Sequence, residues 1–436
     1  MYPSLFRRHV CVSPLPVALW LGIFAALPLP AAGTDATLAL PDAVRLAAAQ
    51  APLVHAQQFR ALAAHDDAVR AGRLPDPELT AGVQNLTATG PRAFALGADA
   101  MTMQTIGVMQ AIPSRAKRTA QTELADTETR LADADSITVE LAAKRAAANA
   151  WVAVWSAERK HALLAELHEQ ATLAVKLAEA QLRGGNGTAT NVLAAQAAAS
   201  ELDNALDAAA ADTAAARAAL QRWVGASAPH TLAGPPDFGS LRVAPAQLLA
   251  DVDRHGPLLG WGAREANAQA AIALAQADKH PDWKVGLVYG RRLDRDDMLG
   301  VEVSVGLPLF TANRQDRAVS ARFADRDAIL AAHEDARRAQ SAAVAVAIAQ
   351  WRGDGQQVGR FQQTLLPLLR DRSRSALALY RGGGALQPWL DAWRDEIRAH
   401  ISYAQVLADW GKSWVELAYL LPDDQTARPA LPEVSP

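Results

Sequence analysis

Residues 282–308 decide the fold, and they read DWKVGLVYGRRLDRDDMLGVEVSVGLP. Apolar residues occupy alternate positions from Trp283 to Tyr289 and again from Leu299 to Leu307. The positions between them hold mostly lysine, glycine, glutamate and serine, so each segment would form a β-strand with one apolar and one polar face. Both segments have about the 9–11 residues that a tilted strand needs to cross a bilayer. This pattern predicts two strands with one face in lipid and one face in a polar lumen.

The same order of segments occurs about 200 residues earlier, which indicates an internal duplication. In this first repeat one strand alternates more weakly than its counterpart, and the phase of the next is ambiguous because Thr105 and Gln110 fall on opposite faces. A long helical segment, a glycine turn and a shorter helix follow each pair of strands. The predicted strands are 77–87, 101–112, 282–291 and 298–308, and the predicted helices are 114–182, 188–224, 312–380 and 386–421. We therefore predict a mixed α/β chain, mainly α, with repeats at 34–225 and 245–421 joined by a linker at 226–244.

The predicted long helices and the small number of strands both point away from a compact domain. A helix of about 68 residues is roughly 100 Å long at 1.5 Å per residue. A sheet in hydrocarbon must close, because its edges cannot remain unpaired there. Barrels begin near eight strands, so four strands cannot close by themselves and several copies must share one barrel.

The two ends of the sequence carry no predicted part of this architecture. Basic residues, an apolar run from Val17 to Leu27 and small residues up to Gly33 predict an export signal at 1–33. Cys11, the single cysteine, lies within it, so we expect no disulfide and no lipid anchor. No later segment is apolar enough for a transmembrane helix. Residues 422–436 are predicted to form a flexible tail, and a net charge of −3 gives no reason to expect a nucleic-acid partner.

The order of elements resembles the TolC-like outer-membrane efflux family over nearly all of the chain after the signal. The most specific matches are helix starts at Pro52 and Pro257, the strand start Leu74–Leu79, the strand end Leu307–Phe310 and the turn from Tyr380 to Ala392. The stretch Met101–Gln110 looks most like the branch that serves heavy-metal pumps of the resistance-nodulation-division type. The resemblance implies a homotrimer in the outer membrane, with a twelve-stranded barrel continued by a periplasmic α-helical barrel. It also implies docking to a periplasmic adaptor protein and an inner-membrane pump.

The resemblance also assigns candidate functional residues. The helix-turn tips for adaptor docking are Arg183, Gly184, Gly185, Gly187, Arg381, Gly382, Gly383 and Gly384. Many relatives have two acidic residues three apart at the periplasmic gate, and here Asp391 matches the later one while Pro388 replaces the earlier one. Asn191 holds the matching place in the first repeat. On the polar strand faces, Glu78 and Glu302 are predicted to face the lumen.

The sequence offers no catalytic constellation, so we predict no enzyme activity and no cofactor. Its ten histidines are scattered, and it contains no paired cysteines and no phosphate-binding loop. Met101, Met103 and Met109 suggest Cu(I), because thioethers suit that soft ion. The competing interpretation, which the sequence favours, is packing on the lipid-facing side of the strands or in a loop.

We therefore predict a passive outer-membrane channel of a tripartite efflux system that exports heavy-metal ions. The same duct could instead serve multidrug export or type I protein secretion. An alternative from another class is a periplasmic helical-hairpin adaptor or scaffold without a pore. Such adaptors usually carry one hairpin within a β-rich domain, whereas this sequence repeats the order strand, strand, helix, helix.

Overall fold

The structure is a computed structural model that describes residues 37–226, 228–229 and 231–422. The predicted signal at 1–33, and all of the predicted tail except its first residue, lie outside the described residues. The described residues belong to one unit that begins at Thr37.

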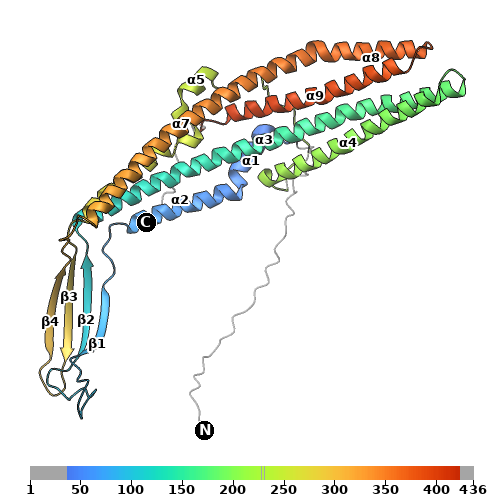
Figure 1. Ribbon diagram of the computed structural model, residues 1–436. Coiled ribbons are helices and arrows are strands. Elements are labelled where there is room, and N and C mark those ends of the chain that lie inside the picture. The colour runs from blue at the N-terminus through green and yellow to red at the C-terminus, as the bar shows by residue number, and fades with distance from the viewer. Residues whose placement is uncertain (1–36, 227, 230, 423–436) are drawn as a thin grey trace, which may run out of the picture. The chain divides into compact units, whose positions relative to one another are not determined.

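Two similar series of elements follow one another along this unit, as the duplication requires (Figure 1). The first series is α1 Leu40–Gln50, α2 Pro52–Arg70, β1 Glu78–Gln84, β2 Met103–Ile112, α3 Arg115–Arg183 and α4 Ala189–Val224. The second is α5 Pro245–Ala250, the short 3₁₀ turns η1 Val252–Arg254 and η2 Gly256–Leu258, α6 Trp261–Ala277, β3 Trp283–Arg291, β4 Met298–Val305, α7 Gln315–Arg360, the π-helical turn η3 Phe361–Leu365, α8 Leu366–Arg381 and α9 Gln387–Ala418. The chain is thus mainly helical with one small sheet, which confirms the predicted fold class.

The four strands form one antiparallel sheet in the order β1-β2-β3-β4. Its central pair, β2 and β3, joins the first repeat to the second, from Gln104 opposite Arg291 to Ile112 opposite Trp283. The outer strands β1 and β4 each pair on one side only within the chain. The sheet is therefore open at both edges.

Helix α3 runs for 69 residues without a glycine or proline. It begins at an N-cap, where the Ser114 hydroxyl accepts a hydrogen bond from the Lys117 backbone N–H. At 1.5 Å per residue it is about 100 Å long. It ends where Gly184 and Gly185 turn the chain, and Gly185 has a φ of +75°. Helices α2, α4, α6 and α9 all pack along α3.

The second long segment differs from the uninterrupted helix predicted at 312–380. It begins at Gln315 and contains a π-helical turn at Phe361–Leu365, immediately before Pro367. Proline has no backbone N–H, and in an α-helix its ring would clash with the carbonyl four residues earlier, that of Gln363. The wider π turn relieves this conflict and lets α8 continue.

The core consists of separate clusters along the helices. Near the glycine turns, Tyr380, Trp389 and Trp393 pack against alanines of α3 and α4. Farther along α3, Trp151 is fully buried, and its indole N–H donates to the backbone oxygen of Leu38. Small residues let the helices approach closely: a β-carbon added to Gly411 of α9 would lie 2.7 Å from the Val152 side chain of α3.

Candidate functional site: the faces of the sheet and the helix-turn ends

One face of the sheet is apolar and exposed across all four strands. Directly opposed residues of neighbouring strands share a face, so Leu79, Val108, Leu287 and Val301 form one row across it. Their exposed fractions are 71%, 48%, 51% and 71%. The remaining exposed apolar residues of this face are Val83, Ile106, Trp283, Val285, Tyr289, Leu299 and Val303. Continuous apolar surface of this kind marks a contact with lipid or with another chain.

The opposite face carries small and polar residues. Glu78, Met109, Gly286 and Glu302 form one register row across it. Both glutamates are exposed, and they lie on the two outer strands. The other side chains of this face come mainly from threonine, serine, lysine and methionine, with glycines between them. The sheet therefore separates an apolar surface from a polar one.

The structure fixes the phase of β2, which the sequence left open. Ile106 and Val108 lie on the apolar face, together with Gln110. The side-chain Nε2 of Gln110 donates to the backbone oxygen of Pro75 at 2.7 Å. Its polar group is thus hydrogen-bonded although it shares the apolar face.

The packing interpretation placed the three methionines on the lipid-facing side of the strands or in a loop, and the structure agrees with it for Met101 alone. Met103 and Met109 are on the polar face, opposite the exposed apolar residues, and Met101 lies in the preceding loop. Placing Met103 and Met109 on the apolar side was therefore wrong. The physical reason is the two-residue period of the strand: Ile106 and Val108 take the even-numbered apolar positions, so the odd-numbered methionines point the other way.

Ion pairs hold the segment between α6 and β3, at the base of the sheet, to the starts of both long helical segments. Lys117 Nζ lies 2.9 Å from Asp278 and 3.2 Å from Asp282, and Asp282 also accepts a hydrogen bond from the Ser114 backbone N–H. Hydrogen bonding to Asp278 is the main cause that raises the pKa of Lys117. In the second repeat, Lys279 pairs with Asp316. The segment that leads into β3 is thus fixed both to α3 of the first repeat and to α7 of the second.

The two glycine turns have matching backbone geometry. In the first, the Asn186 N–H donates to the Gln181 oxygen at 2.9 Å, and in the second the Gly384 N–H donates to the Leu379 oxygen at 3.0 Å. Gly185 and Gly383 have φ values of +75° and +97°, which favour glycine. The predicted tip residues Arg183, Gly184, Gly185, Arg381, Gly382, Gly383 and Gly384 are exposed, and Gly187 is half-buried.

The predicted gate residues lie just beyond these turns. Asp391 is exposed on α9 and accepts a hydrogen bond from Gln387 Nε2 at 2.8 Å. Its neighbour Leu390 is fully buried, so Asp391 lies on the outer side of the helix pair. Asn191 is half-buried in the first turn of α4, where its backbone N–H donates to the Thr188 hydroxyl.

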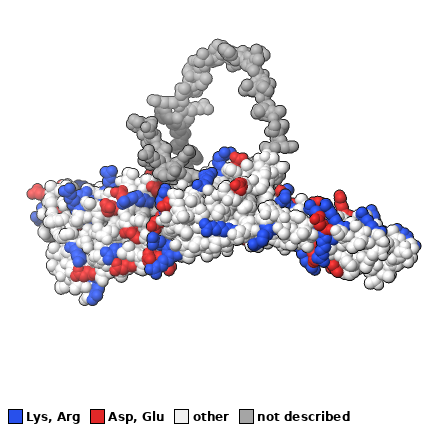
Figure 2. Space-filling view, turned by 90° about the horizontal axis from the view of Figure 1, so that it is seen from above, with Lys and Arg blue, Asp and Glu red and all other residues white. Residues whose placement is uncertain are grey.

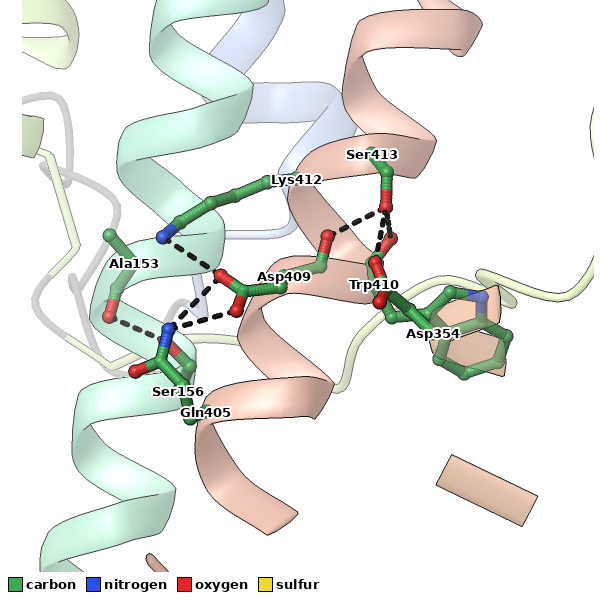
Figure 3. A network of polar contacts seen from close by, with 8 residues as sticks. All are labelled: Ala153, Ser156, Asp354, Gln405, Asp409, Trp410, Lys412 and Ser413. Atoms are coloured by element: carbon green, nitrogen blue, oxygen red, sulfur yellow. Dashed lines mark hydrogen bonds and ion pairs between the residues drawn. The ribbon is translucent and has the colours of Figure 1, made fainter. Parts of the chain in front are cut away.

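Sequence reasoning missed a polar network between α7 and α9 (Figure 3). The Ser413 hydroxyl lies 3.1 Å from Asp354 Oδ2 and 2.7 Å from the backbone oxygen of Asp409. Burial raises the pKa of Asp354. Beside it, the Trp410 indole lies over Gly355, where an added β-carbon would be 2.9 Å from Nε1. The signal in the sequence is Gly355, a glycine within a long helix, which marks a close approach of a neighbouring side chain.

Sequence reasoning also missed a cavity of about 320 Å³ lined by α3, α8 and α9. Glu396 and His400, four residues apart on α9, are nearly fully buried beside it. Burial is the main cause that lowers the pKa of His400, and Arg370 acts in the same direction while Glu396 and Glu166 oppose it. His400 is therefore held neutral within the helix packing.

Charged side chains are mixed over the surface that Figure 2 shows, without a large area of one sign. Within the described ranges, no group of three or more histidine, cysteine, aspartate or glutamate side chains is placed to hold a metal ion. Among the residues that the structure describes, no helix combines the length and the apolar character that crossing a membrane requires.

The sequence matches no protein-family model and no curated protein. Solved structures do match the fold. A membrane protein from Pseudomonas aeruginosa has a TM-score of 0.76 at 17% identity, over 88% of this chain and 91% of that one. CusC has a TM-score of 0.74 at 14% identity, over 88% and 92%. The CmeC outer membrane channel of Campylobacter jejuni has a TM-score of 0.71 at 12% identity, over 89% and 87%. The chain therefore has the same fold as these three proteins over nearly its whole described length.

Proposed function

We propose that this protein is the outer-membrane channel of a tripartite efflux system, a passive duct from the periplasm to the exterior. The observation that carries the proposal is the two-faced sheet at the end of helices about 100 Å long. An exposed apolar face across four strands, with a polar face behind it, is what a wall between lipid and an aqueous lumen requires. A scaffold without a pore could use the apolar face to bind another chain, but it has no need of a polar face behind it on the same four strands.

Closure of this wall requires more than one copy, and the resemblance to the TolC-like family sets the number at three. The sheet is open at β1 and β4, and four strands are too few to close. The helices beside these edges also have exposed apolar residues: α2 presents Phe59, Leu62 and Val69, and α7 presents Phe323 and Leu330. Because α2 leads into β1 and α7 follows β4, one rotation can pair both the strand edges and the helix edges of neighbouring copies. Three copies then give the twelve-stranded barrel.

The far ends of the helices fit the proposed partners. The two glycine turns present exposed backbone of the same geometry at two places in each copy. A periplasmic adaptor protein, itself bound to an inner-membrane pump, would dock on these tips. Asp391 and Asn191 follow the two turns and would line the periplasmic gate, while Glu78 and Glu302 would face the lumen.

For the cargo we propose heavy-metal ions, and multidrug or type I protein export remain the alternatives. The resemblance of Met101–Gln110 to the heavy-metal branch supports this choice. A passive channel contacts its cargo only transiently. The identity of the cargo must therefore be tested through the side chains that face the lumen.

Two measurements on the detergent-extracted protein test the proposal. Native mass measurement should give three copies of the chain, and planar-bilayer recordings should give a steady ion conductance. A variant with Leu62→Glu and Leu330→Glu places charge on both proposed helix edges and should release monomers. A stable monomer of the parent chain, or a membrane without conductance, would show that the proposed channel is wrong.

A further inference from the structure

Methionine has an uneven distribution in this protein. Four of its five methionines are Met101, Met103, Met109 and Met298, within the sheet or the loop before β2. None of the helices that the structure describes contains one, although these helices form most of the apolar core. Methionine is a common filler of irregular cores, so packing alone would place it in the helices as well.

Three of these methionines lie on the polar face of the sheet. Met109 pairs with Glu78 on one side and with Gly286 on the other, and Met298 pairs with Gly290. Met103 lies on the same face of β2, six residues before Met109. Lipid contact therefore does not explain these side chains, because the apolar face is the opposite one.

Glycines of β3 leave room beside two of the thioethers. A β-carbon added to Gly290 would lie 3.2 Å from Met103 Sδ, so this sulfur lies over Gly290. Met298 is the residue opposite Gly290 on β4. Side chains of opposed residues start about 4.5–5.5 Å apart, and methionine has three rotatable bonds, so both sulfurs can reach one point above Gly290.

The second place repeats this arrangement with a carboxylate. The Met109 methyl carbon would lie 3.8 Å from a β-carbon on Gly286, and the Glu302 β-carbon would lie 3.7 Å from it. Along β3 the two places, at Gly290 and Gly286, are about 14 Å apart, at roughly 3.4 Å per residue.

We infer that the polar face of the sheet binds soft monovalent metal ions, Cu(I) or Ag(I), through Met103 with Met298 and, at a second place, through Met109 with Glu302. Neutral thioethers select soft ions over Mg²⁺ and Zn²⁺, whereas the carboxylates attract cations to the wall. Few ligands at each place keep the binding weak enough for release, as transport requires. The inference rests on the proposed channel and names its substrate class.

Silver titration of the full chain in detergent, in nitrate buffer without chloride, tests the inference. The variant Met103→Leu with Met298→Leu keeps side-chain volume and removes both sulfurs of the first place. The second place is unchanged in this variant, so we expect the titration to lose one silver site per copy, with the Ag(I) affinity of the first place lowered at least about tenfold. X-ray absorption should show silver–sulfur scattering in the parent that is reduced in this variant. Met101→Leu, which removes an exposed loop thioether, is the matched control and should bind like the parent.

The outcomes separate the inference from the proposed channel. Equal Ag(I) affinity in the parent and the double variant overturns the thioether sites, as does a loss caused by Met101→Leu instead. Potassium conductance of the parent in planar bilayers tests the channel independently. If the parent conducts potassium but the double variant binds silver like the parent, the metal sites are rejected and the channel is not. If silver is bound to sulfur but the parent does not conduct, the channel is rejected and the metal sites are not.

Discussion

Reversing the polarity of one residue at the centre of the apolar face gives a direct test of the sheet. Val301 is 71% exposed and lies in the same row as Leu79, Val108 and Leu287. In Val301→Arg, a charge near the bilayer midplane should cost about 2–4 kcal/mol per copy, roughly a 30-fold to 900-fold change in the folding equilibrium. The next residue, Glu302, points to the opposite face. Glu302→Arg places the same side chain one position away and should cost little, because the proposed channel places that face in water.

The assay is refolding from urea into lipid vesicles. The folded fraction is measured at each urea concentration, which gives the free energy of folding for the parent and both variants. We expect Val301→Arg to fold poorly in vesicles and Glu302→Arg to fold like the parent. Equal losses in the two variants would refute the assignment of the faces, and a loss confined to Glu302→Arg would show that the faces are reversed.

Four further substitutions test the helical part. Gly411→Ala places a methyl group 2.7 Å from a side-chain carbon of α3 and should lower the free energy of unfolding by about 1–3 kcal/mol. In Gly359→Ala the methyl group meets open space, so this variant should raise the free energy of unfolding by about 0.5–1 kcal/mol. Urea titration measures both. Burial lowers the pKa of His255 and of His400 below 6.5, so the unfolded chain binds more protons than the folded one. The free energy of unfolding should therefore fall as the pH drops below about 6.5. His400→Gln should make this fall smaller, measured by urea titrations between about pH 7.5 and 5. Asp391→Ala should change single-channel conductance and cation preference modestly without affecting folding, and recordings identical to the parent would assign Asp391 to the ordinary solvated surface.

The fold class could be predicted because its signals are periodic and repeated. Alternation from Trp283 to Tyr289 depends only on the two-residue period of a strand, and the duplication supplies the same order twice. The phase of β2 could not be predicted, because Gln110 satisfies its amide by hydrogen bonding to Pro75 from the apolar face. That contact joins residues 35 positions apart and leaves no local pattern.

The parts that escaped prediction depend on single residues in tertiary contact. The segment 226–244 was predicted only as a linker, yet Phe238 is 3% exposed and packs edge-on against Trp155, Trp410 and Trp414. Its backbone oxygen also accepts a hydrogen bond from the Trp351 indole at 2.7 Å. One apolar residue in a loop has no periodicity, so only the folded helices reveal its role.

The duplication also explains why the same surfaces can serve inside one copy and between copies. Within the chain, the repeats meet where β2 pairs with β3 and where α3, which follows β2, packs on α6, which precedes β3. The proposed contact between copies has the same composition: β4 would pair with β1, and α7, which follows β4, would pack on α2, which precedes β1. A trimer of a duplicated chain is thus close to a ring of six similar units. Around this ring, interfaces between the two repeats of one chain alternate with interfaces between neighbouring copies. In the duplication, α2 is the counterpart of α6 and α7 is the counterpart of α3. The exposed apolar residues of α2 and α7 thus occupy the places that α6 and α3 use to pack on each other, which accounts for the apolar surface of these two outer helices in the single chain.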